Sequence, residues 1–377
     1  MASISHNIAR ACGNLAADLH AAEKRNNGMY HMTGQGLSGA TALLALIGSC
    51  TVFSSAQADA VSDFYRGKQI SVVIGTSAGN DYDFRGRLIA RHMGRHIPGE
   101  PTIVPRNMPG AGGINAANWL AAVAPRDGTT LHMIMTNMMA AQAIGTQGVT
   151  FDTRKFRWIG NTTSSPNVTN SWHTSGITNI EQTKTRELVL GAPAGTAGVV
   201  YGTVLNALVG TKLKIVTGYP GGNEVNLAME RGEVEGRGSN SWASWKSTKP
   251  EWIAQKKIIM LVQVGLARNP DLPDVPLLLE LAGNDLDRKV LTFLSAETAL
   301  SRSLVTTADV PADRLQALRR AYDATMLDPQ FLADAEKAKM DISAMTGEES
   351  QNIADQIVNT PPAVIARAKV VLGDLLK

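Results

Sequence analysis

The sequence predicts an α/β protein with two domains, and three observations support this prediction. The chain has 377 residues, which exceeds the length of one ordinary domain. Short β-rich runs alternate with segments whose apolar residues recur at helical spacing. Loops of small residues repeatedly connect the end of a predicted strand to the start of a predicted helix. This order is typical of parallel α/β layers, in which helices join neighbouring strands.

The first α/β layer contains three predicted strands, at residues 68–74, 102–105 and 131–135. Helices are expected between these strands, at residues 84–93 and 116–123. Small-residue loops at 75–80 and 110–113 precede the two helices, and the third strand ends at Thr136 and Asn137.

A second α/β layer is expected after residues 158–160, with strands at 188–190, 214–217 and 258–264 and helices at 199–208 and 224–231. From Pro311 onward the pattern is helical, with Asp309 as the expected N-cap and Asp328-Pro329 at the end of the first helix. We therefore divide the chain into a leader (1–58), a first lobe (59–160), a second lobe (161–294) and a return to the first lobe with the C-terminal helices (295–377).

The first 58 residues are typical of an export signal. Residues 40–53 form a 14-residue apolar stretch, which suits the hydrophobic region of a signal peptide and is too short to span a membrane. The stretch leads to Ala56-Gln57-Ala58, a small-x-small pattern, so cleavage is expected after Ala58. A lipid anchor at Cys50 is the less favoured alternative. Because the only other cysteine is Cys12, the mature chain would contain no thiol and no disulfide.

Composition excludes several classes of protein. The chain has 36 Lys and Arg against 33 Asp and Glu, a net charge of +3 without the basic stripe of a nucleic-acid-binding protein. No segment has the roughly 18 uninterrupted apolar residues of a membrane span. The hydrophobic content of 44% excludes a disordered chain.

Three enzyme-like or metal-like motifs are present but lack their partners. Residues Gly75 to Gly79 match the G-x-S-x-G elbow of serine hydrolases, with Ser77 as nucleophile. Such an enzyme requires a histidine downstream of its acidic residue, yet the last histidine is His173, so a hydrolase is only the alternative function. His92 and His96 have chelating spacing but no accompanying glutamate. The Gly110–Gly113 loop lacks the third glycine of a dinucleotide motif, and we expect neither a metal nor a cofactor.

The four small-residue loops indicate an anion site instead. They lie at residues 75–80, 110–113, 194–198 and 218–222, each between a predicted strand and a helix. Helix N-termini carry unpaired N–H groups and a partial positive charge, so they can bind a carboxylate without a basic side chain. Open α/β sheets bind ligands at the carboxyl ends of their strands. The loops therefore predict a carboxylate-binding cleft between two domains.

At these loops the sequence resembles the solute receptors of tripartite tricarboxylate transporters, the Bug-type periplasmic binding proteins. The family motif Asn-x-Pro-Gly-Ala-Gly-Gly is present as Asn107–Gly113, and Pro-x-Asp-Gly-x-Thr-Leu as Pro125–Leu131. The Pro-Asp-Val-Pro motif stands at Pro273–Pro276, and Val310-Pro311 opens the terminal helices. The resemblance extends over nearly all of residues 62–377.

The resemblance implies a type II periplasmic-binding-protein fold, with two α/β lobes and a ligand cleft between them. It further implies that backbone amides of two loops hold the carboxylate of the ligand and that Asp83 supports the first loop. The expected ligand-binding residues, including neighbouring loop positions, are Thr76, Ser77, Ala78, Gly79, Asn80, Asp83, Asn137, Ala194, Gly195, Thr196, Ala197, Tyr219, Pro220, Gly221 and Asn240.

The same resemblance implies a receptor that serves two integral-membrane transporter subunits. We also expect the protein to be exported and monomeric and not to bind nucleic acid. Its ligand would be a dicarboxylate, a tricarboxylate or an aromatic carboxylate. The sequence departs from the family pattern where Asn80 replaces a glycine and where Tyr219-Pro220-Gly221 lacks the usual lysine. Trp242 and Trp245 could stack on an aromatic acid, although core packing is the favoured role for this pair.

Overall fold

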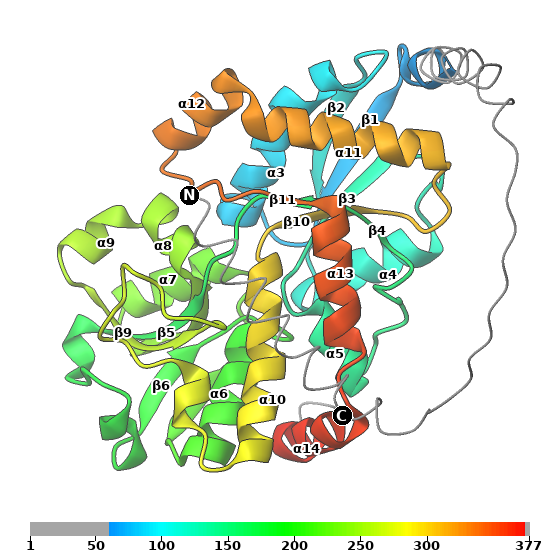
Figure 1. Ribbon diagram of the computed structural model, residues 1–377. Helices are drawn as coiled ribbons and strands as arrows, with labels where there is room; N and C mark the ends of the chain where they lie inside the picture. The colour runs from blue at the N-terminus through cyan, green and yellow to red at the C-terminus, as the bar shows by residue number, and fades with distance from the viewer. Residues whose placement is uncertain (1–59, 374–377) are drawn as a thin grey trace, which may run out of the picture. The chain divides into compact units, whose positions relative to one another are not determined.

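The computed structural model describes residues 60–373, whose backbone forms two mixed β-sheets flanked by helices (Figure 1). The predicted leader, its cleavage site after Ala58 and both cysteines lie outside the described residues. Residues 60–65 form a helix directly before the first strand. Within residues 60–373, no helix combines the length and apolar character needed to cross a membrane.

The first sheet has six strands in the order β11-β4-β10-β3-β1-β2. They are β1 (Gln69–Ile74), β2 (Thr102–Asn107), β3 (Thr130–Ile134), β4 (Arg157–Asn161), β10 (Ser303–Thr306) and β11 (Met345–Thr346). β1 pairs in parallel with β2 and β3, as the alternating pattern predicts. β10 is antiparallel to both β3 and β4. The chain returns from the second sheet at the carboxyl end of β3, with Ser303 opposite Ile134, and therefore has to run in the opposite direction.

The second sheet has five strands in the order β7-β6-β8-β5-β9. They are β5 (Asn167–Trp172), β6 (Leu188–Gly191), β7 (Leu213–Val216), β8 (Gly236–Ser241) and β9 (Ile258–Val264). β6 is parallel to β7 and β8, whereas β5 is antiparallel to β8 and β9. We call the first sheet with its helices the first lobe and the second sheet with its helices the second lobe.

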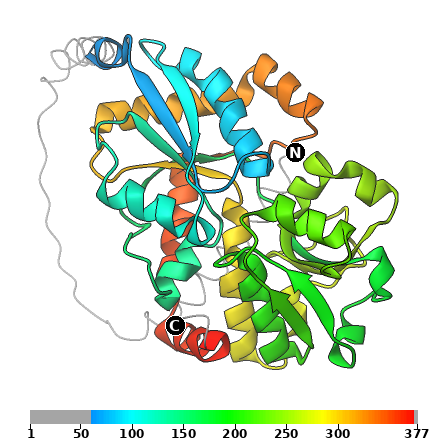
Figure 2. The ribbon, with the colours of Figure 1, turned by 180° about the vertical axis from the view of Figure 1, so that it is seen from behind.

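Twelve α-helices with defined bounds cover the sheets in the described part of the chain (Figures 1 and 2). They are α3 (Asp81–His92), α4 (Ile114–Ala122), α5 (Met138–Ile144), α6 (Ala197–Val209), α7 (Gly222–Glu230), α8 (Trp242–Thr248), α9 (Pro250–Ala254), α10 (Asp285–Ala296), α11 (Ala312–Leu327), α12 (Pro329–Lys337), α13 (Gly347–Val358) and α14 (Pro362–Leu372). Short 3₁₀ helices occur at Met93–His96, Ala111–Gly113, His173–Ser175, Glu181–Lys184, Leu278–Leu281 and Glu297–Leu300. Helices α3, α4, α6 and α7 begin at the four predicted small-residue loops.

The C-terminal segment is helical as predicted, apart from the two residues of β11. The prediction that Asp309 caps its first helix is wrong. Pro311 is the N-cap of α11, and no side chain caps this helix. Asp309 instead forms an ion pair with Arg126 at 2.5 Å. Asp328 stands at the predicted helix end and caps α12 through its side chain.

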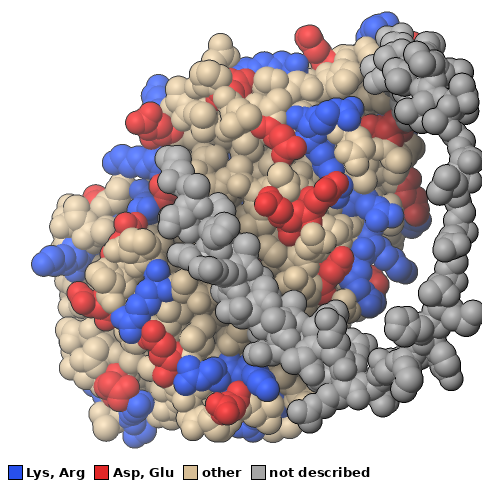
Figure 3. All heavy atoms as spheres, viewed as in Figure 1, with Lys and Arg blue, Asp and Glu red and all other residues tan. Residues whose placement is uncertain are grey.

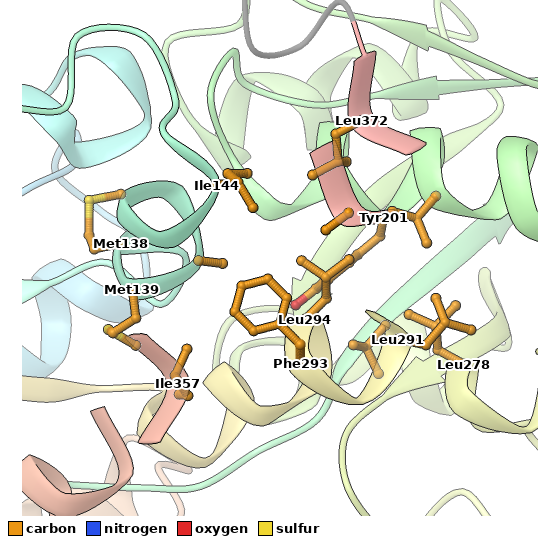
Figure 4. Close-up of a cluster of buried hydrophobic side chains, with 14 of the residues drawn as sticks. Met138, Met139, Ile144, Tyr201, Leu278, Leu291, Phe293, Leu294, Ile357 and Leu372 are labelled. Carbon is orange, nitrogen blue, oxygen red and sulfur yellow. The ribbon is translucent and has the colours of Figure 1, made fainter. Parts of the chain in front are cut away.

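One hydrophobic core connects the helices of both lobes (Figure 4). Met138 and Met139 of α5 and Ile357 of α13 come from the first lobe, whereas Tyr201 of α6 and Leu294 of α10 come from the second. All five side chains are buried. This shared core holds the two lobes together along these helices, while the loops at the strand ends remain available to form a site.

The charged surface agrees with the composition. On the face that Figure 3 shows, Lys and Arg side chains are interspersed with Asp and Glu side chains, and no large area of one sign is visible. The two histidines with chelating spacing contact carboxylates of α12 and its cap. His92 lies 2.9 Å from Asp334, and His96 lies 2.7 Å from Asp328. These contacts attach α3 and the 3₁₀ turn after it to the C-terminal helices.

Candidate functional site

The four small-residue loops surround one cavity of about 250 Å³ between the two sheets. Loops after β1 and β2 contribute from the first lobe, and loops after β6 and β7 contribute from the second. Ten of the residues expected from the sequence line this cavity: Thr76, Asn80, Asn137, Ala194, Thr196, Ala197, Tyr219, Pro220, Gly221 and Asn240. The volume suits a ligand smaller than a typical drug-sized molecule.

Five of the expected residues do not line the cavity, namely Ser77, Ala78, Gly79, Asp83 and Gly195. The Gly79 amide donates to Asp83 Oδ2 at 2.9 Å and is therefore not available to a ligand. Gly195 uses its carbonyl oxygen to accept a hydrogen bond from Asn137 Nδ2 at 2.8 Å. These positions shape the loops, whereas their neighbours form the cavity wall.

Asp83 and Asn80 hold the first loop in place. Asp83 accepts hydrogen bonds from Arg87, from Gly79 and from Asn107. Burial acts to raise the pKa of Asp83, but these hydrogen bonds outweigh it and the pKa is lowered. The side-chain oxygen of Asn80 accepts from the amides of Tyr82 and Asp83, so it caps α3. The loop therefore uses several of its amides for its own structure.

The N-termini of α6 and α7 are open toward the cavity. Neither helix has a side-chain N-cap hydrogen bond. Within residues 60–373, the amides of Ala197 and Gly198 on α6 and of Gly222 and Asn223 on α7 have no acceptor, and all four residues line the cavity. The first turns of α3 and α4 begin at the same cavity. Each helix brings a partial positive charge, so the cavity favours an anion.

An ion-pair network forms one wall of the cavity. The buried carboxylate of Asp81 contacts Arg85 Nε at 3.0 Å and Arg302 Nε at 2.5 Å. Although burial acts to raise the pKa of Asp81, the charges of the two arginines lower it. The Arg302 guanidinium also lies 3.9 Å from the centre of the Tyr82 ring. Two arginines around one carboxylate leave an excess of positive charge beside the cavity.

Arg237 on β8 is a second cation in the cavity wall. Its pKa is lowered to about 10 by burial and, to a smaller extent, by the charge of Arg302, while the charge of Glu224 acts in the opposite direction. Neither arginine follows from the sequence prediction, which treats the loops as an anion site that needs no basic side chain. The sequence feature that could have pointed to Arg237 is its position as a charged residue between Gly236 and Gly238.

The loops of the two lobes contact each other beside the cavity. Asn223 Nδ2 of the second lobe donates to the Gly79 carbonyl at 2.9 Å, in addition to the contact between Asn137 and Gly195. Lys246 of α8 forms an ion pair with Asp341, which precedes β11 of the first lobe. The structure therefore represents an arrangement in which the loops meet over the cavity.

The hydrolase-like motif has no catalytic partners in the described residues. No histidine or carboxylate there is hydrogen-bonded to Ser77 Oγ, and Ser77 does not line the cavity. His132 is buried, its Nδ1 faces the Val73 carbonyl at 2.9 Å, and burial lowers its pKa to about 4. The arrangement lacks the nucleophile–base contact of an acyl-transfer enzyme.

The two tryptophans belong to the core of the second lobe. Trp242 and Trp245 pack with Trp172 and Trp252, and the rings of Trp245 and Trp252 are 5.8 Å apart. Trp242 donates from Nε1 to Asp271 at 2.8 Å. Neither tryptophan lines the cavity, so the core role is the one that the structure supports.

No protein-family model matches this chain, and no curated protein matches its sequence. Solved structures do match its fold. Rpa4515 of R. palustris, solved with adipate, is 18% identical over 81% of this chain and 97% of its own, with a TM-score of 0.62. MatC (Rpa3494) from Rhodopseudomonas palustris, with bound malate, is 19% identical over 81% and 99%, with a TM-score of 0.61. The periplasmic binding protein BugD is 19% identical over 83% and 96%, with a TM-score of 0.59.

These matches cover most of the described chain and nearly all of each neighbour. They confirm the prediction of a two-lobed α/β fold, and they confirm that the resemblance at the loops extends to the whole architecture. This chain therefore has the fold of the Bug-type periplasmic solute-binding proteins.

Proposed function

We propose that this protein is an exported receptor that captures a small organic carboxylate and delivers it to a tripartite tricarboxylate-type membrane transporter. The observation that carries the proposal is the cavity at which helices α3, α4, α6 and α7 all begin and beside which Arg237 and Arg302 lie. The neighbours solved with adipate and malate support a carboxylate ligand. The signal-like leader supports a periplasmic location, with cleavage after Ala58.

In the proposed mechanism the receptor binds its ligand and catalyses no reaction. The acid first enters between the separated lobes and docks near Thr76 and Asn80 of the first lobe. The second lobe then closes and adds the open amides of α6 and the Tyr219 loop. Closure follows because the ligand binds the closed state more tightly than the open state. The two membrane subunits would recognise the closed form of a monomeric receptor.

Isothermal titration calorimetry on the protein without its leader tests the proposal. The panel contains dicarboxylic, tricarboxylic, hydroxy and aromatic acids. We expect at least one acid to bind at one site with a Kd below about 10 µM, which corresponds to roughly −7 kcal/mol. Circular dichroism before the titration confirms that the protein is folded. A folded protein that shows no binding across the panel would contradict the proposal.

Ser77→Ala separates a receptor from the alternative serine hydrolase. Because Ser77 does not line the cavity, we expect the variant to retain the affinity of the wild type within about threefold. A hydrolase would instead lose turnover of an activated ester such as p-nitrophenyl acetate by several orders of magnitude. Wild-type turnover that disappears in Ser77→Ala would therefore support the hydrolase and overturn the receptor assignment.

A further inference from the structure

Arg237 is held in place by neutral hydrogen-bond acceptors, and the Glu224 carboxylate acts on its charge without forming an ion pair with it. Its Nε donates to the Ser239 carbonyl at 3.1 Å, and its Nη1 donates to Asn226 Oδ1 at 3.0 Å and to the Gly222 carbonyl at 3.4 Å. None of the ion pairs in residues 60–373 includes Arg237. Three donor contacts thus fix the orientation of the guanidinium, and none of them pairs it with a carboxylate.

The remaining nitrogen of this guanidinium, Nη2, is available to a ligand. It has no hydrogen-bond partner in the described chain, and it lies against Gly222, which also lines the cavity. Arg237 lines the cavity. A guanidinium that is already oriented loses little conformational freedom when it pairs with a carboxylate.

A second unpartnered donor lies on the same strand. Asn240 is 8% exposed and lines the cavity, and its Nδ2 is buried and has no acceptor within residues 60–373. Residues three apart on a regular strand point to opposite faces. Here Val168 pairs with Asn240 and Asn170 pairs with Arg237, so β8 has one extra residue against β5. This bulge turns Arg237 and Asn240 toward the same cavity.

The cavity wall offers few carboxylates to an ammonium ion. Among residues 60–373, Asp81 is the only acidic residue that lines the cavity, and the unpartnered Oε2 of Glu224 lies behind Gly221. The oxygens of Asp81 already accept hydrogen bonds from Arg85, Arg302 and Ser247. A bound ammonium group would therefore find no free carboxylate among these lining residues and would lie beside Arg237 and Arg302. Negative charge is favoured at both ends of a ligand, whereas an amino substituent is disfavoured.

We propose that Arg237, with Asn240 beside it, binds a second carboxylate, so that the ligand is a small dicarboxylate without an amino group. This inference rests on the proposed receptor function. One carboxylate of the ligand occupies the open amides of Ala197 and Gly198 at the N-terminus of α6. The other forms a charge-assisted hydrogen bond with Arg237 Nη2, and charge-assisted bonds are among the stronger ones in proteins. Arg237 is thus the residue that distinguishes a dianion from a monoanion.

The test compares matched ligands on matched variants by isothermal titration calorimetry. The ligands are malonate, succinate, glutarate and adipate, the monoamide of each, and the amino acids aspartate and glutamate. For the best dicarboxylate, we expect wild type to prefer it at least 30-fold over its own monoamide. Succinate and glutarate should likewise be preferred over aspartate and glutamate, the amino acids of the same length. In Arg237→Gln, the affinity for the dicarboxylate should fall about 100-fold, whereas the affinity for the monoamide should change less than about threefold.

Two further variants complete the experiment. Arg231→Gln removes an exposed positive charge from the end of the neighbouring helix α7 without touching the cavity, and it should leave both affinities unchanged. Arg237→Lys keeps the charge but loses the planar fork, so its dicarboxylate affinity should lie between those of wild type and Arg237→Gln. Urea unfolding establishes that each variant is folded.

The outcomes separate this inference from the function on which it rests. A wild type that binds monoamides as tightly as dicarboxylates would overturn the inference and leave the receptor function standing, and this comparison requires no variant. Equal losses for both ligands in Arg237→Gln would also overturn it. Tight binding of aspartate or glutamate would contradict the exclusion of an amino group. A folded wild type that binds no acid of either panel would contradict the receptor function itself.

Discussion

Asp81→Asn is expected to lower the free energy of unfolding by about 3–5 kcal/mol, which is typical when one partner of a buried ion pair is removed. Asp81 is 1% exposed and is the carboxylate that neutralises both Arg85 and Arg302. Arg85 is equally buried, and its Nη2 already has no partner. The asparagine would therefore leave two buried guanidinium groups without a counter-charge. Urea unfolding at neutral pH measures the loss.

The lowered pKa of Asp81 determines how its contribution to the free energy of unfolding changes with pH. Because the folded pKa of Asp81 is lowered, its stabilisation is complete well above the ordinary aspartate pKa of about 3.9 and is lost as the pH falls through the folded value. As the pH is lowered, the free energy of unfolding of Asp81→Asn should therefore fall less than that of the wild type. Asp63→Asn is the matched control, since Asp63 is 69% exposed in its pair with Arg66. This substitution should change the free energy of unfolding by no more than about 0.5 kcal/mol. Equal effects of the two substitutions would contradict a structural role for the buried network.

Gly112→Ala is expected to weaken ligand binding about 10- to 100-fold while the protein remains folded. Gly112 has φ +62°, and a Cβ there would lie 2.3 Å from the carbonyl oxygen of Gly195 on the opposite lobe. The two loops would have to separate, which would also lengthen the contact between Asn137 and Gly195. Overpacking of this kind typically costs about 1–3 kcal/mol, and here the cost falls on the closed state alone.

Gly210→Ala is a close control for this prediction. Gly210 has φ +79°, and a Cβ at this position would meet no atom within 4 Å. Both variants therefore share the backbone strain of about 1 kcal/mol, but only Gly112→Ala obstructs the contact between lobes. Calorimetry measures the affinity, and small-angle X-ray scattering measures whether ligand reduces the radius of gyration. If Gly112→Ala bound and compacted like the wild type, the contact between these loops would not belong to the closed state.

Much of the fold could be predicted from local sequence. The apolar runs before residue 75 and at 188–190 lie on buried strands, and the glycine-rich segments after them start the helices at the cavity. The direction of β10 could not be predicted, because it depends on where the chain returns from the second lobe. The core role of Trp242 and Trp245 is the favoured prediction from the sequence, whereas their partners Trp172 and Trp252 depend on a tertiary contact.

The candidate site, like the fold, could be predicted only in part from the sequence. The loops could be located because glycine and small residues at strand ends are a local signal. The use of each amide could not be predicted, because Asn80 caps α3 and Asp83 binds the Gly79 amide only in the folded loop. Arg237 reaches the cavity through the bulge in β8, and Arg302 comes from the segment that returns to the first lobe. Neither position follows from periodicity alone.

A crystal structure of the protein grown with the dicarboxylate that binds most tightly tests the proposed site without an intermediate step. We expect one carboxylate within about 3.2 Å of the Ala197 and Gly198 amides and the other within the same distance of Arg237 Nη2. A ligand that lies outside this cavity, or that leaves the amides of α6 without a partner, would contradict the proposal that these helix N-termini bind the acid.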